Sequence, residues 1–515
     1  MKIKELLKKQ SLIVPSKSAV IYEGKHISFF QLKEDSFRLA NYFLNLGINN
    51  LDKIAVYLPN SYEAIISFLA TFSIGAVLVP LDFMFTQEEV INLINHSEAK
   101  LLITQAKKRI DLEKIRKQCK GLKEIIVIGI KDKEFIYWDE IFEKSSSREP
   151  SVNFNDDKLA TILYTSGSWG DPKGVMLTYK HLDCPVRVIE YFLKTSTKDI
   201  FICPGIPLSH LGGLDYIFLT IWHGATMVLM QRFSPLEFLK NIEKYKVTVF
   251  WIVPSMYTAI LSLKEYEKFD LSSLKYAVVF GAPSSPYLLK KFHRLCPNAY
   301  LLNGWGMTET SAPNCVLPSG SRKIESIGKF VPWMEARIVD ENGNTLRENE
   351  VGELWVRGEG VMSGYYKQPE LTKEILTEDG WLKTGDIAKF DEKGFFYIVG
   401  RKKDMIKVGG EAVFSTEIEE KIYTHPKVKE VAVIGVFDKL RGEVPKAFVV
   451  VKEGEKLSEK ELRVFLKEKL APFKIPHYFE FVDELPKTRT GKVNKKILKE
   501  KGCFRYQERR ETQQV

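Results

Sequence analysis

The stretch Ala160–Thr178, ATILYTSGSWGDPKGVMLT, decides how the rest of the chain is interpreted. It begins as an apolar run typical of a buried strand and then passes into glycines and small hydroxyl residues. Gly167 and Gly170 would let backbone N–H groups come close to an anion, and Lys173 would add a positive charge. The stretch therefore predicts a phosphate-binding loop, with an ordinary Gly/Ser turn between a strand and a helix as the alternative.

The spacing of this loop differs from that of the common nucleotide-binding loop, G-x-x-x-x-G-K-[ST]. Gly167 is followed by Gly170 only three residues later, and Lys173 is followed by Gly174 where Ser or Thr would stand. If the loop binds phosphate, it is a loop of a different kind, and its hydroxyl donors would be Thr165, Ser166 and Ser168. The rest of the chain has to decide between the two interpretations.

The composition is that of a globular protein with more than one domain. The 515 residues are 44% hydrophobic and 28% charged, and the chain is too long for one typical core. Six cysteines stand apart with no C-x-x-C pair, which argues against a zinc site and against a disulfide framework. Because no apolar run is long enough for a secretion signal or a membrane span, we expect a cytoplasmic protein.

The net charge of +10 suits an enzyme that handles polyanions, or a protein that contacts an anionic membrane surface peripherally. Lysine-rich solvated faces would give the same charge. No aromatic and basic pattern typical of nucleic-acid binding accompanies it, so nucleic-acid binding is a weak alternative. The oligomeric state stays open between monomer and homodimer.

Apolar runs alternate with amphipathic stretches over most of the chain, beginning with KIAVYLPN at 53–60. This pattern predicts an α/β fold with layered, largely parallel sheets. From about Ile324, short alternating strands with Gly and Asn turns predict a β subdomain over about 324–400. The charged, glycine-ended segment GRKKDMIKVGG follows, so we expect a large N-terminal domain, 1–400, joined by a hinge to a small α+β domain, 401–515.

Four further segments carry residues suited to a nucleotide. FGAPSSP at 280–286 ends a strand with residues small enough for a flat ring to lie against the backbone, and NGWGMTET at 303–310 brings an aromatic plane and a carboxylate. GWLKTGD ends in Asp386, and GRKKD presents Arg401 fifteen residues later, a pair suited to ribose hydroxyls. LPKTRTGKVNKK places Lys492 after a Thr/Gly turn, where a mobile loop could carry it to a distant site.

In their order and spacing these segments resemble the motifs of the adenylate-forming superfamily, which includes acyl-CoA synthetases, firefly luciferase and the adenylation domains of peptide synthetases. The similarity runs from about Ile27 to Ile497, and several independent motifs agree. The resemblance implies an AMP-forming acyl-CoA synthetase that uses ATP, Mg²⁺ and coenzyme A (CoA). It favours the phosphate-loop interpretation of Ala160–Thr178.

The resemblance also implies which residues would bind the nucleotide. The β- and γ-phosphates of ATP would lie on the loop residues Thr165, Ser166, Gly167, Ser168, Gly170 and Lys173. The adenine would lie against Gly281, Ala282, Pro283, Trp305 and Gly306. Asp386 and Arg401 would bind the ribose, and Mg²⁺ would be held by Thr165 and Glu309.

The remaining matched positions concern catalysis and the other substrates. Lys492 corresponds to the lysine that assists adenylation, and Thr308 would lie by the α-phosphate and the carboxylate of the acid. His210 would stand at the entrance of the acyl pocket. Lys403 would be the hinge. The pantetheine of CoA would pass a loop that approaches once the small domain has turned, formed by Lys407, Gly409 and Gly410.

The chain departs from the family pattern at two points, and a third position is unusual. Ser168-Trp169 stands where the family usually has Thr-Thr, so Trp169 brings no hydroxyl to the phosphates. Trp305 stands where the family usually has Tyr, which keeps an aromatic plane and loses the phenol. Pro185 lies early in the helix after the phosphate loop, and the sequence gives no functional reason for it.

The acid would bind between the segments at 210–222, HLGGLDYIFLTIW, and 249–261, VFWIVPSMYTAIL, which we interpret as apolar walls without a buried charge. Room would be left by four glycines, namely Gly212, Gly213, Gly281 and Gly304. These walls favour a medium- or long-chain fatty acid. Four alternatives stay open: an aromatic acid of the coumarate or benzoate type, an acyl carrier protein as acceptor, an oxygenase like luciferase, and a non-catalytic nucleotide-binding protein.

Overall fold

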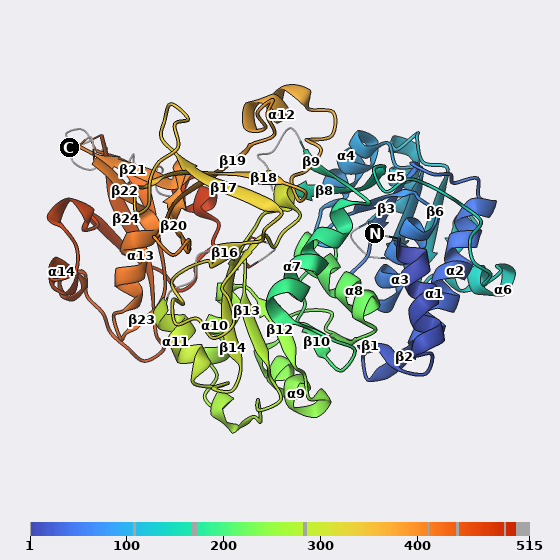
Figure 1. Ribbon diagram of the computed structural model, residues 1–515, viewed down its shortest axis with the longest axis horizontal. Helices are drawn as coiled ribbons and strands as arrows, with labels where there is room; N and C mark the ends of the chain where they lie inside the picture. The colour runs from blue at the N-terminus through green and yellow to red at the C-terminus, as the bar shows by residue number, and fades with distance from the viewer. Residues whose placement is uncertain are drawn as a thin grey trace.

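The computed structural model describes residues 2–106, 110–165, 172–281, 286–409, 411–438, 442–488 and 491–500. Within these residues the strands form four sheets, two of which are large and mainly parallel (Figure 1). The predicted α/β fold with layered, largely parallel sheets is confirmed. No helix in this part of the chain is both long and apolar enough to cross a membrane.

The first large sheet contains both strands that flank the expected phosphate loop. Its strand order is β7-β6-β5-β3-β4-β8-β9, and all neighbouring strands are parallel except β8 and β9. The strands are β3 (Lys53–Tyr57), β4 (Val77–Pro80), β5 (Leu101–Gln105), β6 (Glu124–Ile128), β7 (Ile136–Tyr137), β8 (Leu159–Thr165) and β9 (Lys173–Thr178). Thr165 at the end of β8 stands opposite Lys173 at the start of β9.

The second large sheet has the order β16-β15-β14-β13-β12-β10-β11-β1-β2 and is parallel from β14 to β1. Its strands are β1 (Ser18–Tyr22), β2 (Lys25–Ser28), β10 (Ile200–Cys203), β11 (Thr226–Leu229), β12 (Val249–Ile252), β13 (Tyr276–Val279), β14 (Tyr300–Trp305), β15 (Cys315–Val316) and β16 (Lys329–Phe330). Because the carboxyl ends of parallel strands meet at one edge, the segments after β13 and β14 are brought together there.

Two smaller sheets follow in the chain. The third is antiparallel and consists of β17 (Met334–Val339), β18 (Gly352–Gly358), β19 (Leu382–Phe390) and β20 (Phe396–Arg401). The fourth consists of β21 (Met405–Val408), β22 (Glu411–Phe414), β23 (Val428–Asp438), β24 (Gly442–Val451) and β25 (Tyr478–Phe481). The short 3₁₀ turn Lys402–Asp404 joins the third sheet to the fourth.

Helices cover both faces of the two large sheets. The main core lies between them and includes α3 and α8, whose residues are almost all buried. A helix that is apolar around its whole circumference needs such an enclosed place. The helices of this region are α1 (Ile3–Ile13), α2 (Phe29–Asn45), α3 (Tyr62–Ser73), α4 (Gln87–Ser97), α5 (Leu112–Gln118), α6 (Trp138–Lys144), α7 (Cys184–Leu193), α8 (Leu211–His223), α9 (Pro235–Tyr245), α10 (Pro254–Leu261) and α11 (Pro286–His293).

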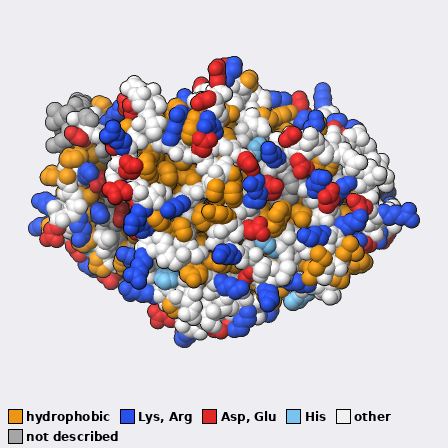
Figure 2. All heavy atoms as spheres, viewed as in Figure 1, with side chains coloured by type: hydrophobic (Ala, Val, Ile, Leu, Met, Phe, Trp, Pro, Cys, Tyr) orange, Lys and Arg blue, Asp and Glu red, His pale blue; other side chains and the backbone are white. Residues whose placement is uncertain are grey.

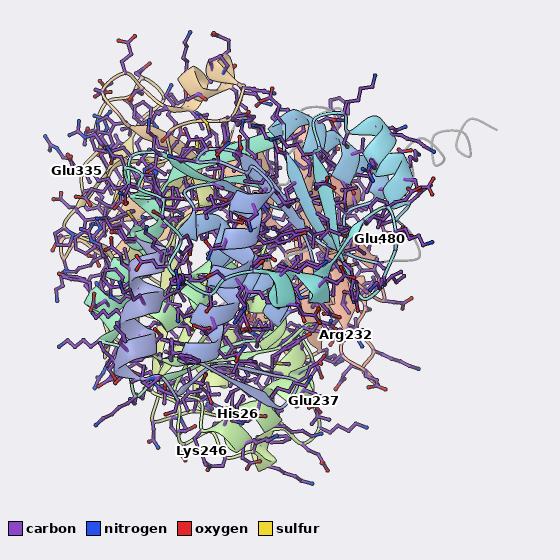
Figure 3. The ribbon with its side chains drawn as sticks, turned by 90° about the vertical axis from the view of Figure 1, so that its right-hand side faces the viewer. His26, Arg232, Glu237, Lys246, Glu335 and Glu480 are labelled. Carbon is purple, nitrogen blue, oxygen red and sulfur yellow. The ribbon has the colours of Figure 1, made fainter. Side chains whose placement is uncertain are left out.

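The remaining helices lie in the C-terminal third: α12 (Pro369–Ile375), α13 (Ser415–Tyr423) and α14 (Glu459–Lys467). Figure 1 places α13 and α14 with the fourth sheet at one end of the molecule. In the side view of Figure 3, His26 of β2 lies at the lower end with Glu237, in the first turn of α9, and Lys246, which directly follows α9. Glu335 of β17 lies at the upper left. In this view, the second and third sheets therefore extend toward opposite ends of the molecule.

Two features singled out in the sequence, Pro185 and the net charge, can be placed in the fold. Pro185 lies in the first turn of α7, where a proline removes no helical hydrogen bond, so its position has a simple structural reason. Lysine and arginine side chains are spread over the face shown in Figure 2, with acidic side chains among them. On this face, the positive net charge is not gathered in one patch.

Candidate active site

The residues assigned to the nucleotide converge at the carboxyl-terminal edge of the nine-stranded sheet. Gly281 follows β13 and Trp305 ends its parallel neighbour β14, so both reach this edge. The third sheet arrives at the same place with β19 and β20, in which Asp386 pairs directly with Arg401. Segments from two different sheets therefore build one polar site.

Asp386 is held on both of its carboxylate oxygens. The Nε of Arg401 lies 2.7 Å from Oδ1, and the indole N–H of Trp305 donates to Oδ2 at 2.8 Å. Asp386 is 3% exposed, whereas the side chain of Arg401 is 46% exposed. The two residues assigned to the ribose are thus in contact, and Trp305, which was assigned only to the adenine, is bonded to one of them.

Lys492 reaches this edge from the C-terminal part of the chain. A Cβ built on Gly281 would lie 3.6 Å from Cε of Lys492 and 3.9 Å from Nζ of Lys492. A Cβ on Gly491 would lie only 2.9 Å from Oγ of Ser255 at the start of α10. The absence of side chains at these two glycines therefore lets the Lys492 loop pack closely against the nine-stranded sheet.

The environment of Lys492 suits an anion. Lys492 is exposed as a whole residue, but desolvation by the surrounding atoms lowers the pKa of its amine, with a further lowering by the positive charge of Arg401. The carboxylates of Asp386 and Glu309 act in the opposite direction. Among the described residues the amine has no hydrogen-bond partner, so its N–H donors are available to a ligand.

Glu309 lies in the 3₁₀ turn Thr308–Thr310 directly after β14 and is 8% exposed. The phenol of Tyr365 donates to its Oε1 at 2.9 Å, and the amine of Lys173 lies 5.8 Å from the centre of the Tyr365 ring. Burial and the charge of Glu309 raise the pKa of Tyr365, so its O–H remains a donor. Tyr365 therefore links Glu309 to β9.

Sequence reasoning missed Tyr365. Its signal in the sequence is the aromatic pair that directly follows Gly364 inside the third-sheet region. The segment is tied to β9, because the backbone N–H of Met176 donates to the carbonyl of Gly364 at 3.0 Å. The spacing of residues along the sequence could not predict that the segment with Gly364 and Tyr365 packs against the strand pair that carries Thr165 and Lys173.

His210 stands at the N-terminal end of α8 and is about one-third exposed. Its Nε2 lies 3.3 Å from Oδ2 of Asp82. Asp82 is buried and stands two residues after the end of β4. Asp82 was also missed by sequence reasoning, although it directly follows the strand-like run AVLVPL. The carboxylate fixes the orientation of the imidazole at the proposed entrance of the acyl pocket.

The expected room for the acid is only partly present. A Cβ on Gly212 would find nothing nearer than Ile206 at 3.9 Å, so a small side chain would fit there without a clash. A Cβ on Gly213 would lie 2.3 Å from the carbonyl oxygen of Pro207, and one on Gly304 would lie 1.9 Å from the ring of Phe280. The expectation that Gly213 and Gly304 leave room is therefore wrong, because backbone and a phenylalanine ring occupy that space.

The wall residues differ from expectation in one further respect. Tyr216 stacks on Trp251 with ring centres 3.5 Å apart, and its O–H donates to the Trp251 carbonyl at 2.9 Å. Asp215, which the sequence interpretation passed over as part of an apolar wall, is a buried carboxyl. Burial raises its pKa well above the usual range, so the wall is not free of acidic groups as expected.

The residues assigned to the hinge and to CoA lie in the C-terminal part. Lys403 is in the 3₁₀ turn that leaves β20, and Lys407 is an exposed residue of β21. Gly409 has φ +59° and nothing within 4 Å of a built Cβ. In Figure 1, β21 and β22 lie on the outer side of the fourth sheet, away from β13 and β14. In this arrangement Lys492 occupies the site and Lys407 does not.

Gly306 has a packing reason for being glycine, since a Cβ there would lie 2.4 Å from the Cβ of Ala312. Seven assigned residues lie outside the described part of the chain, namely Ser166, Gly167, Ser168, Gly170, Ala282, Pro283 and Gly410. Trp169 lies outside it as well. Their assignments stay predictions.

Comparison with known proteins identifies the family. The model of the AMP-binding enzyme family matches residues 7–366, and that of the AMP-binding enzyme C-terminal domain matches 417–492. The chain is 32% identical to the long-chain-fatty-acid–CoA ligase of Bacillus subtilis, with 94% of this chain and 92% of the relative covered. It is 34% identical to 4-coumarate–CoA ligase 1 of Petroselinum crispum, with 92% and 89% covered.

A solved structure agrees with this result. The anthranilate CoA ligase AuaEII in complex with anthranoyl-AMP superimposes with a TM-score of 0.93 at 26% identity, and 98% of each chain is covered. The chain belongs to the AMP-binding enzyme family of the adenylate-forming superfamily. Within this superfamily it is an AMP-forming acid–CoA ligase, which uses ATP, Mg²⁺ and CoA.

The residues in the site fit these groups chemically. The unpartnered amine of Lys492 beside the bare backbone of Gly281 suits a phosphate or a carboxylate oxygen. Mg²⁺ prefers hard oxygen ligands and usually takes one or two from the protein when it binds substrate phosphates. The carboxylate of Glu309 and the hydroxyl of Thr165 offer such oxygens near β9.

Proposed function

We propose that this enzyme converts a medium- or long-chain fatty acid to its acyl-CoA, with an acyl-adenylate as the intermediate and with release of pyrophosphate and AMP. The observation that carries the ligase chemistry is the position of Lys492, which meets Gly281 beside the Asp386–Arg401 pair. Three polar groups from distant segments thereby surround one place where a nucleotide would lie.

In the first half-reaction the acid carboxylate attacks the α-phosphate of ATP and pyrophosphate leaves. Asp386 and Arg401 would hold the ribose, with Trp305 against the adenine. Lys492 would stabilise the negative charge that develops between the attacking oxygen and the phosphate, and Thr308 would bind oxygens at the same centre. Positioning and electrostatics supply the catalysis, and no enzyme nucleophile is required.

Glu309, with Thr165, would hold Mg²⁺, which when bound neutralises charge on the phosphates. Tyr365 would keep the Glu309 carboxylate oriented, because its O–H is already bonded to Oε1. The loop that follows Thr165, with Lys173 at its end, would bind the β- and γ-phosphates.

In the second half-reaction a thiol displaces AMP from the adenylate. We assign residues 1–400 to a large domain and 401–515 to a small domain that turns about Lys403. The turn would withdraw Lys492 and bring Lys407, Gly409 and Gly410 to the site. The single short connection at Lys402–Asp404 between the third and fourth sheets supports a pivot there.

The choice of a fatty acid rests on the walls of the acyl pocket. A side chain at Gly212 would meet only Ile206, Phe280 presents apolar surface, and the buried residues Tyr216 and Trp251 pack behind this wall. Burial raises the pKa of Asp215, which disfavours a negative charge in this wall that could pair with an amino group.

An aromatic acid is the second candidate, and a specific observation favours it. The ring of Phe280, which lies against Gly304 and is only partly buried, offers a flat apolar surface that suits a planar ring. The anthranilate ligase with the TM-score of 0.93 acts on such an acid.

A panel experiment tests both candidates. Acid-dependent AMP release is measured with octanoate, palmitate, 4-coumarate, benzoate and acetate, each with CoA and with acyl carrier protein as acceptor. We expect the highest kcat/KM with a fatty acid and CoA. A higher value with 4-coumarate or benzoate would overturn the fatty-acid proposal in favour of the second candidate, and a higher value with carrier protein would overturn the choice of acceptor.

A further inference from the structure

The contact between Trp305 and Asp386 links two segments that are 81 residues apart in the sequence. Trp305 ends β14 in the nine-stranded sheet, and Asp386 lies in β19 of the third sheet. Both side chains are buried, at 7% and 3% exposure. A hydrogen bond to a carboxylate in such a place is worth more than one at the surface, because water competes poorly for it.

The two partners of Asp386 differ in how firmly they are held. Arg401 is 46% exposed on its side chain and is the last residue of β20. Trp305 is packed on its other side against Phe330, with ring centres 5.6 Å apart. The indole is therefore the more rigid of the two donors to the carboxylate.

We propose that Trp305 is a positioning residue, whose indole N–H fixes the carboxylate of Asp386 in the orientation that accepts the ribose hydroxyls of ATP. This inference rests on the proposed function, in which Asp386 binds the ribose. A carboxylate with one oxygen fixed by Trp305 keeps its remaining lone pairs aimed in one direction, so no ordering is needed when the nucleotide arrives. The indole thus has a second role besides offering a flat surface to the adenine.

The test separates the N–H from the aromatic plane. Dissociation constants of Mg·ATP and of Mg·2′,3′-dideoxy-ATP are measured by calorimetry on the wild-type protein and on Trp305→Phe. We expect wild type to prefer ATP, and the variant to lose about ten-fold of that preference, since hydrogen bonds to charged groups are the stronger ones. Weaker packing or weaker stacking would affect both nucleotides equally and leave the ratio unchanged.

Two further variants sharpen the result. Replacement of Trp305 by 3-benzothienylalanine keeps the shape and removes only the N–H, so it should lower the ratio as Trp305→Phe does, even if the smaller phenylalanine disturbs folding. Phe330→Leu loosens the packing on Trp305 but keeps the indole N–H, so it should lower the ratio less than Trp305→Phe does. In an Asp386→Asn background, Trp305→Phe should change the ratio little.

The outcomes distinguish this inference from the function on which it rests. Wild-type protein that binds neither nucleotide would contradict the proposed function and this inference together. Wild-type preference for ATP that survives in full in the benzothienylalanine variant would contradict the inference alone.

Discussion

The proposed nucleotide half and the proposed acyl half of the site are organised in different ways. In the nucleotide half, polar side chains from distant segments converge and are fixed by single directed bonds, as Asp386 is by Trp305 and Glu309 is by Tyr365. In the acyl half, apolar groups fill space, as Phe280 does against Gly304 and Tyr216 does on Trp251. We therefore expect that loss of a single donor or acceptor atom changes activity in the nucleotide half, whereas changes of side-chain volume change activity in the acyl half.

The largest effect is expected for Lys492→Ala. Loss of one preorganised donor at a developing charge costs about 2.7–4 kcal/mol, so acid-dependent pyrophosphate release should fall by roughly 10²–10³. Thioester formation from synthetic acyl-adenylate and CoA should persist, because Lys492 is not required in that half. Lys496→Ala, which removes an exposed lysine of the same segment, is the matched control. An equal loss in both half-reactions would show that Lys492 has a structural role.

The next effect is expected for Lys403→Pro. A proline fixes φ near −65°, which suits a 3₁₀ turn, so the present arrangement with Lys492 in the site should survive. Pyrophosphate release should then remain, while thioester formation falls by at least roughly 10², since misplacement of a reacting group by about 1 Å has that cost. Lys403→Ala removes the same side chain without fixing the backbone and should retain both activities. Thioester formation by the proline variant at the wild-type rate would exclude a hinge at this residue.

A smaller effect is expected for Tyr365→Phe, which removes the O–H that holds Glu309. Loss of a partner that orients a metal ligand typically costs about 10–100-fold in metal affinity, so the Mg²⁺ concentration for half-maximal adenylation should rise by that factor. Tyr366→Phe removes the neighbouring phenol, which bonds to the exposed Glu98, and should leave the Mg²⁺ dependence unchanged. If Tyr365→Phe shows the same Mg²⁺ dependence as Tyr366→Phe, Tyr365 does not orient a ligand of the metal.

The two halves also differ in how far the sequence could predict them. The largely parallel α/β sheets could be predicted from the pattern of apolar runs. The proposed nucleotide residues could be picked out by motifs, because the types needed to bind phosphate and ribose are few and stand at strand ends. The contacts of Trp305 and Tyr365 could not be predicted, since they join segments whose approach depends on how the sheets pack.

The acyl half was harder to predict for a related reason. A glycine in a sequence can mean either open space or a close approach, and only three-dimensional packing distinguishes Gly212 from Gly213 and Gly304. The burial of Asp215 was missed because one acid in an apolar helix is usually placed toward solvent.

The smallest effect is expected for Phe280→Leu, which replaces the ring that fills the space beside Gly304. One methylene in a hydrophobic pocket is worth ~1–3 kcal/mol, and at the lower end of this range the ratio of palmitate to octanoate turnover should rise by about ten-fold. The variant is compared with wild type after a thermal melt confirms that it folds. An unchanged ratio would show that Phe280 does not line the acyl pocket. Faster turnover of both acids would indicate that the variant loosens the site as a whole.

The position of Arg401 has a kinetic consequence in the proposed function. Its backbone pairs with Asp386 and its side chain holds the same residue, and the connection to the fourth sheet begins only after it. A rotation about Lys403 would leave both ribose anchors on the stationary side, although Arg401 is the first residue of the small domain as we divide the chain. The adenylate would then stay bound while one loop leaves and the other arrives, so little of it should escape to hydrolysis in water, and each ATP consumed should yield nearly one thioester.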